Sequence, residues 1–363
     1  MQITTRDSCV SMAKGIAIVL MVLAHARFSH YGGVYINMFH MPLFFFMSGY
    51  CFKEAYLDDF LTFSKKRIQR AYWPYVKWSL LFLLLHNVFF ALNIYNNEFG
   101  FRGVTSQLYT VKDFLTRSLL IIGSMSGEEQ LLGGYWFLHS YFFAAFISFF
   151  TMVLFKNHLQ YIVVGGAFLL IASLVCSMLG LRIPYYIEPR EILASAFIVT
   201  GFAYKRSGWR LEEKPIVILI GAIIVAIGVK YWPCNMLSLS WQRIVPYYLS
   251  SLAGILMVFG FCKFICGFKM MAKAWSYVGD RTLDILTWHF LSFKVVSLVI
   301  ISVYGITISR LSEFPVIEEY AYRGWWVLYL FVGVLVPLLI EGVVSKIKKR
   351  ISVIANHSSE RHF

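Results

Sequence analysis

The chain has 363 residues, of which 59% are hydrophobic and only 14% are charged, and its mean hydropathy is +0.66. Soluble domains carry about 25% charged residues, so this composition excludes a soluble globular protein and leaves too little polar sequence for a separate soluble domain. Lys and Arg number 33 against 19 Asp and Glu, which gives a formal net charge of +14. These cations punctuate apolar stretches and build no soluble basic face, which argues against nucleic-acid binding and is typical of cytoplasmic loops in membrane proteins.

Apolar stretches of membrane-spanning length recur from end to end. They predict an all-α integral membrane protein, a single domain over residues 1–363, built as a bundle of about ten transmembrane helices around a central channel. The expected spans are 9–28, 35–53, 71–93, 134–155, 159–180, 189–206, 215–232, 246–265, 282–304 and 325–345.

The distribution of charge between the spans predicts the orientation of the chain. The most basic connections are expected in the cytoplasm, together with both termini, and the first of them is a loop near 54–70. The long connection near 94–133 is then an outer loop, and its amphipathic part favours a lid or an interfacial helix. The six cysteines form no CxxC pair, so no metal site and no disulfide framework are expected.

Two polar residues interrupt the first apolar stretch, KGIAIVLMVLAHA. Lys14 and His25 are eleven residues apart, so on a helix they lie within roughly 20° of one face and about 16 Å apart along the axis. A cation and an imidazole on one stripe of a membrane helix usually face a polar cavity. His25 is therefore a candidate general base, because the pKa of histidine lies near working pH.

The second span opens with FHMPLFFFMSGY, residues 39–50. His40 lies early in this span and His25 late in the first, so a short hairpin over 30–35 would bring the two rings to a similar depth. His40 is then either a second polar group in the cavity or an interfacial residue. Ser48-Gly49 allows another helix to approach closely.

A basic cluster at residues 65–70 precedes the third span. Arg67 and Arg70 are three residues apart and share a helix face, and guanidinium forks suit phosphate oxygens. Two interpretations stay open. The cluster is either a loop that sets the orientation of the chain or a cytosolic clamp for a phosphorylated donor such as a coenzyme A thioester.

Other polar residues lie at the ends of later spans. Trp136 and His139 share one face at the outer start of the fourth span, and Asp284 and His289 fall in the inner half of the ninth. A carboxylate within a span needs a partner, and the candidates for Asp284 are Arg281, Lys294 and His289. A structural ion pair or an interfacial position is the alternative for each of these residues.

Taken in order, these motifs resemble acyltransferase family 3, the bacterial transmembrane acyltransferases that modify cell-surface glycans. Lys14 and His25 match the family's first-span pattern of a basic residue and a histidine, although Arg is more usual at the first place. Arg67 and Arg70, followed by Pro74, match its R-x-x-R pattern before the third span. FHMPLFFFMSGY, YWFL and SYVGDRTLDILTWHF look like its second-span, fourth-span and late motifs, and the similarity is greatest to the sugar O-acetylase branch.

The resemblance implies an inner-membrane O-acyltransferase that moves an acyl group, foremost acetyl, from cytosolic acyl-CoA to a sugar hydroxyl of an envelope glycan or lipid-linked intermediate. His25 would accept the hydroxyl proton or take part in a transient acyl transfer. Lys14, Arg67 and Arg70 would offset the charge of the donor. The acceptor side and supporting positions would be His40, Trp136, His139, Asp284 and His289. Acyl-CoA, the acceptor and membrane lipids are the implied partners, with no permanently bound cofactor and no metal.

Two other classes of function compete with this interpretation. In a transporter or flippase for a lipid-linked or anionic solute, the intramembrane His, Lys and Asp residues would form a proton relay or a substrate path. The sequence shows no inverted repeat and no pair of Gly/Pro-broken helices of the kind many secondary transporters have. A non-catalytic subunit of envelope assembly is the third alternative.

Overall fold

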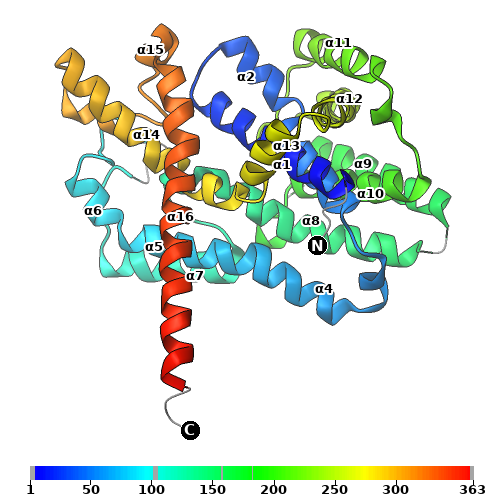
Figure 1. Cartoon of the computed structure of the whole chain (residues 1–363), viewed down its shortest axis with the longest axis horizontal. Helices are drawn as coiled ribbons and strands as arrows, with labels where there is room; N and C mark the ends of the chain where they lie inside the picture. Colours follow the sequence, from blue (N-terminus) through cyan, green and yellow to red (C-terminus); the bar gives the residue numbers. More distant parts are fainter. Residues whose placement is uncertain (1–4, 101–104, 157, 182, 360–363) are drawn as a thin grey trace.

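The computed structural model describes residues 5–100, 105–156, 158–181 and 183–359, and every regular element within them is a helix (Figure 1). The described residues form no strand beyond an isolated bridge between Ile183 and Ile187. This confirms the all-α class. Apolar helices satisfy all their backbone hydrogen bonds internally, which is why a chain this poor in polar residues adopts them in a membrane.

Within the described residues, six helices are long and apolar enough to cross a membrane. These six segments are Ser8–His25, Gln130–Leu154, Leu159–Leu179, Trp241–Ile265, Thr282–Tyr304 and Glu318–Ile347. They coincide with all or most of α1 (Thr5–His25), α8 (Trp136–Leu154), α9 (Leu159–Leu179), α12 (Trp241–Ile265), α14 (Thr282–Tyr304) and α16 (Trp326–Ser359). Six of the ten expected spans therefore have the length and composition of a transmembrane helix.

The other four expected spans hold helices that are shorter or carry more charge. The second is divided into α2 (His30–Asn37) and α3 (His40–Tyr50), because the backbone leaves helical geometry at Phe39. The third is divided into α5 (Trp73–Leu84) and α6 (His86–Ala91). α10 (Pro189–Ser207) carries charged residues at both ends, and α11 (Ile216–Tyr231) has only 16 residues.

The basic segment expected as a loop near 54–70 is helical. Asp59 caps α4 (Phe60–Arg67) by accepting a hydrogen bond from the backbone of Thr62 at 2.9 Å. One turn of π-helix, Ile68–Tyr72, joins α4 directly to α5. The cations are therefore held on a rigid element, in contrast to the loop that the sequence suggested.

The connection near 94–133 contains the amphipathic helix α7 (Val111–Ser124), which begins with a capping box between Thr110 and Asp113. Its apolar residues Val111, Leu115 and Ile122 are exposed on one stripe. An exposed apolar stripe on an amphipathic helix suits the membrane interface. The remaining helix is α13 (Lys269–Gly279), with short turns at Glu54–Asp58, Gln130–Tyr135, Pro184–Tyr186, Leu211–Glu213, Ile308–Ser312, Glu318–Tyr320 (α15) and Ala321–Trp325.

Two buried hydrophobic clusters meet along α1. Met12, Ala13 and Ile16 from its first half pack in one cluster with α3, α8, α9, α10 and α12, whereas Met21 and Val22 from its second half pack in the other with α5, α14 and α16. Figure 1 shows α14 and α16 on one side of α1 and α9 to α12 on the other. α1 thus lies at the junction of two packing units, where cavities can form between them.

Small residues bring α3 and α10 into backbone contact. A Cβ atom on Gly49 would lie 1.8 Å from the carbonyl oxygen of Ile198, and one on Gly201 would lie 2.0 Å from that of Phe46. Small residues allow such close packing of membrane helices. The contact anchors α3, which supplies residues to both cavities described below.

Candidate active site

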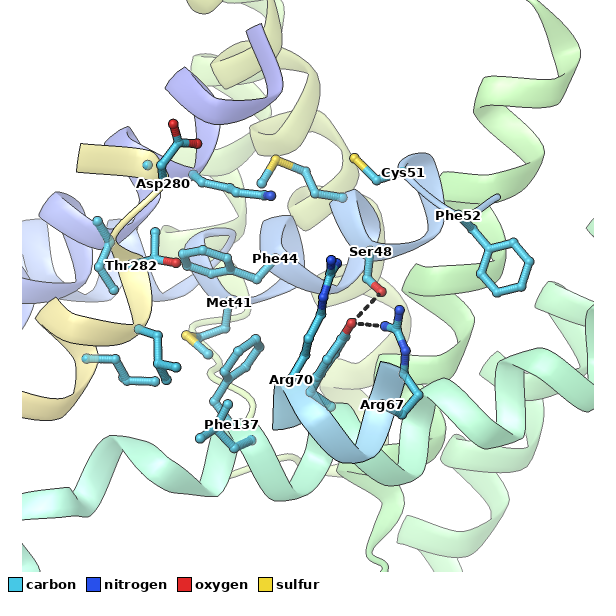
Figure 2. Close-up of a pocket in the computed structure, with 18 of the residues that line it drawn as sticks. Met41, Phe44, Ser48, Cys51, Phe52, Arg67, Arg70, Phe137, Asp280 and Thr282 are labelled. Atoms are coloured by element: carbon cyan, nitrogen blue, oxygen red, sulfur yellow. Dashed lines mark hydrogen bonds between the residues drawn. The ribbon is translucent and has the colours of Figure 1, made fainter. Parts of the chain in front are cut away.

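A cavity of about 660 Å³ opens between α1, α3, α4, α8 and the start of α14 (Figure 2). We call it the basic cavity, because its lining includes five cationic side chains, Lys14, Lys53, Lys66, Arg67 and Arg70. Among the described residues, no carboxylate lies within 4 Å of any of these five charges. The lining also holds the carboxylate of Asp280, so the five cations leave the cavity with a net positive charge. A cleft lined mostly by one sign of charge attracts the opposite sign, so the cavity is suited to an anion.

Arg67 is the buried member of this group, with 8% of its surface exposed. One of its terminal nitrogens donates to the hydroxyl of Tyr141, which also accepts from Ser48 at 3.4 Å (Figure 2). Its guanidinium lies 5.3 Å from the centre of the Phe63 ring. The Nε atom is buried and has no hydrogen-bond partner in the described structure. A buried donor without a partner indicates a place where a ligand oxygen completes the site.

The π-helical turn that follows Arg67 carries Arg70. Arg70 is exposed, yet it lines the same cavity as Arg67, and Figure 2 shows both side chains beside Ser48. Single π-helical turns occur frequently at functional sites. The shared face that the sequence predicted for these two arginines is present, and it meets the cavity.

Lys14 reaches the basic cavity from α1, which crosses α13 at backbone contact. A Cβ atom on Gly15 would lie 2.2 Å from the carbonyl oxygen of Trp275, and one on Gly279 would lie 1.7 Å from that of Ser11. At the same crossing, the Ser11 hydroxyl donates to Asp280 at 2.8 Å. Two glycines therefore determine how closely α13 lies against the helix that carries Lys14.

A second cavity of about 370 Å³ lies at the other end of the same stripe of α1. We call it the histidine cavity, because His25 and His40 both line it. The hairpin predicted to bring these two rings together is present, with α2 as its connection. The other polar groups in its lining are Arg27, Asn37, Trp136, Asn235 and Ser238, and none of its described lining residues is acidic.

His25 is held by a hydrogen bond to His289. Nδ1 of His289 lies 3.0 Å from the carbonyl oxygens of both Ile285 and Leu286, and it must donate because carbonyl oxygens only accept. In the neutral ring Nε2 is then an acceptor, and Nδ1 of His25 donates to it at 3.2 Å. This arrangement leaves Nε2 of His25 without a proton, in the form that a general base requires.

The ring of His40 is oriented by its own helix. Its Nδ1 donates to the carbonyl oxygen of Ile36 at 2.9 Å, which leaves Nε2 as the acceptor of the neutral ring. Two imidazoles with free acceptor nitrogens thus line one small cavity. Such a pair can accept hydrogen bonds from hydroxyl groups.

The structure separates Trp136 from His139. Trp136 lines the histidine cavity, whereas His139 is not among the described residues that line either cavity. The ring of His139 is engaged elsewhere, because Nε2 donates to the carbonyl oxygen of Tyr185 at 3.0 Å and Nδ1 lies 3.5 Å from Glu191. Ser140 donates to the same carboxylate at 2.5 Å. His139 therefore joins α8 to α10 and lies outside the cavity.

Asp284 also lies outside the described linings of both cavities. Two of its candidate partners are engaged elsewhere. Arg281 donates to Glu341 at 2.9 Å, and Lys294 donates to the carbonyl oxygens of Leu311 and Glu313 at 2.8 and 2.7 Å. Buried Lys294 thus ties α14 to the segment that follows it.

Several lining residues went unnoticed in the sequence. Tyr141 lies five residues after Trp136, and Lys53 is the last residue of the expected second span. Both therefore sit near recognised motifs. Asn235 comes from the connection between α11 and α12, and no pattern around it indicates a site. In the described part of the chain, no group of three or more His, Cys, Asp or Glu side chains could hold a metal ion.

The two cavities adjoin one another. Three residues, Met21, Met41 and Leu286, line both of them. The basic cavity lies on the Lys14 side of these residues and the histidine cavity on the His25 side. The arrangement can hold an anionic molecule in one compartment and a hydroxyl-bearing molecule in the other.

Comparison with known protein families gives one result, a match to a family model described as an acyltransferase domain, over residues 7–342. This range includes every residue that lines either cavity. Neither a curated protein nor a solved structure shows a significant match to the chain.

Proposed function

The chain belongs to acyltransferase family 3, and from that premise we propose that this membrane acyltransferase moves an acyl group, foremost acetyl, from acyl-CoA to a sugar hydroxyl. The acceptor would be a cell-envelope glycan or a lipid-linked intermediate. The observation that carries the proposal is the pairing of the two cavities. One holds five cations that form no ion pair with a carboxylate of the described residues, and the other holds a histidine whose Nε2 is available as an acceptor.

The basic cavity would bind the phosphates of the donor. Arg67, Arg70 and Lys14 supply charge there, and the unpartnered Nε of Arg67 supplies a donor for a phosphate oxygen. Hydrogen bonds between guanidinium groups and phosphates are charge-assisted and stronger than neutral ones. A compact ammonium such as Lys14 neutralises charge without the planar fork of arginine.

The histidine cavity would hold the acceptor. Nε2 of His25 accepts the proton of the sugar hydroxyl while the hydroxyl oxygen attacks the thioester carbonyl. The new ester bond forms as the bond between carbonyl carbon and sulfur breaks, and the coenzyme A thiolate takes up the proton from the imidazolium. A transient acyl-histidine is the alternative route, in which the same nitrogen attacks first.

Supporting roles follow from position. His289 would keep His25 in the tautomer that acts as a base, and His40 would accept hydrogen bonds from acceptor hydroxyls. Trp136 offers an indole ring to a sugar face. His139 and Asp284 lie outside the described linings and would act through the packing of α8 and α14.

We assign the protein to the bacterial inner membrane with both termini in the cytoplasm. Four of the five cations of the basic cavity belong to the segment 53–70. Cytoplasmic loops carry an excess of basic residues, which supports a cytoplasmic position for this side. Acyl-CoA is a cytosolic metabolite, so a donor site on this face meets its substrate directly.

The test is incubation of the purified protein with labelled acetyl-CoA and a panel of envelope glycans and lipid-linked sugars. Transfer of label to a sugar, with release of free coenzyme A, would support the proposal. A protein that binds no acetyl-CoA would overturn it. Uptake of a solute into proteoliposomes without any acylation would favour the transporter instead.

A further inference from the structure

Four residues of α1 form one stripe, Lys14, Ile18, Met21 and His25, with spacings of four, three and four residues. Such spacings keep side chains on one helix face. Lys14, Ile18 and Met21 line the basic cavity, and Met21 and His25 line the histidine cavity. Met21 therefore lies where one cavity ends and the other begins.

α3 and α14 repeat this pattern. On α3, His40 and Met41 line the histidine cavity, and Met41, Phe44 and Ser48 continue along the basic cavity. On α14, Thr282, Leu283 and Leu286 line the basic cavity, and Leu286 and Phe290 line the histidine cavity. Each of the three helices thus contributes one residue to the same level.

The three shared residues are apolar and almost wholly buried, with exposures of 3% for Met21, 9% for Met41 and 8% for Leu286. The polar side chains of the basic cavity lie on one side of these three residues, and those of the histidine cavity lie on the other. Narrow apolar constrictions exclude water and ions. Methionine side chains are flexible and adapt to irregular contacts, so a constriction that contains two of them can open and close with little change in the helices.

We propose that Met21, Met41 and Leu286 form a septum between the two cavities, which is closed without donor and is parted by the acyl-bearing end of the donor on its way to His25. The inference rests on the proposed function, because it takes acyl-CoA as the occupant of the basic cavity. It adds three residues that contact the donor to those of the proposed function. It also explains how a donor in the basic cavity reaches His25 in the histidine cavity without an open pore.

The experiment uses proteoliposomes that hold a pH gradient, with a trapped pH dye as the readout. The opened protein carries Met21→Ser, Met41→Ser and Leu286→Ser, since a small hydroxyl side chain both widens and wets the constriction. The matched control carries Met47→Ser and Met236→Ser. Both control residues are buried methionines, but Met47 lines only the basic cavity and Met236 only the histidine cavity.

Wild type and the control should hold the gradient, whereas the opened protein should lose it. Acetyl-CoA added on the side of the basic cavity should slow the loss, because the bound donor refills the constriction. If the triple variant does not fold, the single Met41→Ser variant replaces it in the same experiment. Its proton flux should exceed that of wild type, by less than is expected for the triple variant.

An opened protein that binds acetyl-CoA like wild type and still holds the gradient would overturn the septum. A loss of the gradient that bound acetyl-CoA does not slow would overturn the passage of the donor. Absence of acetyl-CoA binding in wild type is a different result, since it would remove the proposed function itself.

Discussion

Nε2 of His289 lies 3.2 Å from Nδ1 of His25, and the two rings are nearly parallel, with 10° between their planes. The bond joins α14 to α1 across 264 positions of the chain. It determines which nitrogen of His25 is free, because Nδ1 of His289 is already committed to backbone carbonyls. Under the proposed function the pair is a base with its support, and each member makes a separate prediction.

Replacing His25 with alanine should abolish most acyl transfer. Loss of a general base typically costs about 10²–10⁴-fold in rate. Binding of acetyl-CoA should persist, because His25 lines only the histidine cavity and the donor phosphates are assigned to the other. Turnover and equilibrium binding of labelled acetyl-CoA measure the two effects. A folded His25→Ala protein with full transfer would exclude His25 as the base or as the acyl carrier.

Replacing His289 should lower the rate without removing the base. In His289→Leu the Nδ1 proton of His25 loses its acceptor. An unpaired buried group costs about 1–3 kcal/mol. If this cost falls on the reactive tautomer of His25, the rate drops by roughly fivefold to a hundredfold. His289→Gln keeps a side-chain acceptor and should recover part of the activity. Equal losses in the Leu and Gln variants, at unchanged thermal stability, would argue against an orienting role.

Removing the positive charges that line the basic cavity should lower the affinity for the donor. Hydrogen bonds to charged groups contribute about 1.5–3 kcal/mol, so Arg67→Gln should weaken acetyl-CoA binding by roughly tenfold to a hundredfold. Arg70→Gln should weaken it less, because Arg70 is exposed and solvent screens its charge. Lys65→Gln is the matched control, since Lys65 is a cation of the same helix outside the cavity lining. Titration calorimetry compares the three, and an equal effect of Lys65→Gln would show that only net charge matters.

The sequence predicted the helical class and the stripe of α1, because both depend on local periodicity. Lys14 and His25 are eleven residues apart, and helix geometry alone places them on one face. The same reasoning placed His40 near His25, since a short connection leaves two helix ends few alternatives.

Contacts between distant segments could not be read in this way. The partner of His25 is 264 residues away, and nothing in the spacing of LTWHF selects His289 for it. His139 looked like a cavity residue because it shares a helix face with Trp136. Its ring instead meets Glu191 of α10, a contact that depends on how two helices pack. The break at Phe39 also went unpredicted, and so did the helical form of 60–72, although its N-cap Asp59 is a local signal.

The crossing of α1 and α13 predicts that one methyl group added at Gly279, which lines the basic cavity, disturbs the donor site. Gly279→Ala would place a Cβ atom 1.7 Å from a backbone oxygen, so the two helices must separate. Overpacking of this kind costs about 1–3 kcal/mol, and it should also weaken acetyl-CoA binding, because α1 carries Lys14. Gly342→Ala in α16 is the control. Nothing lies within 4 Å of that added methyl group, and alanine is favoured over glycine in a helix by about 0.5–1 kcal/mol. Thermal unfolding should therefore separate the two variants in opposite directions, and a Gly279→Ala protein as stable as wild type would show that the backbones do not meet there.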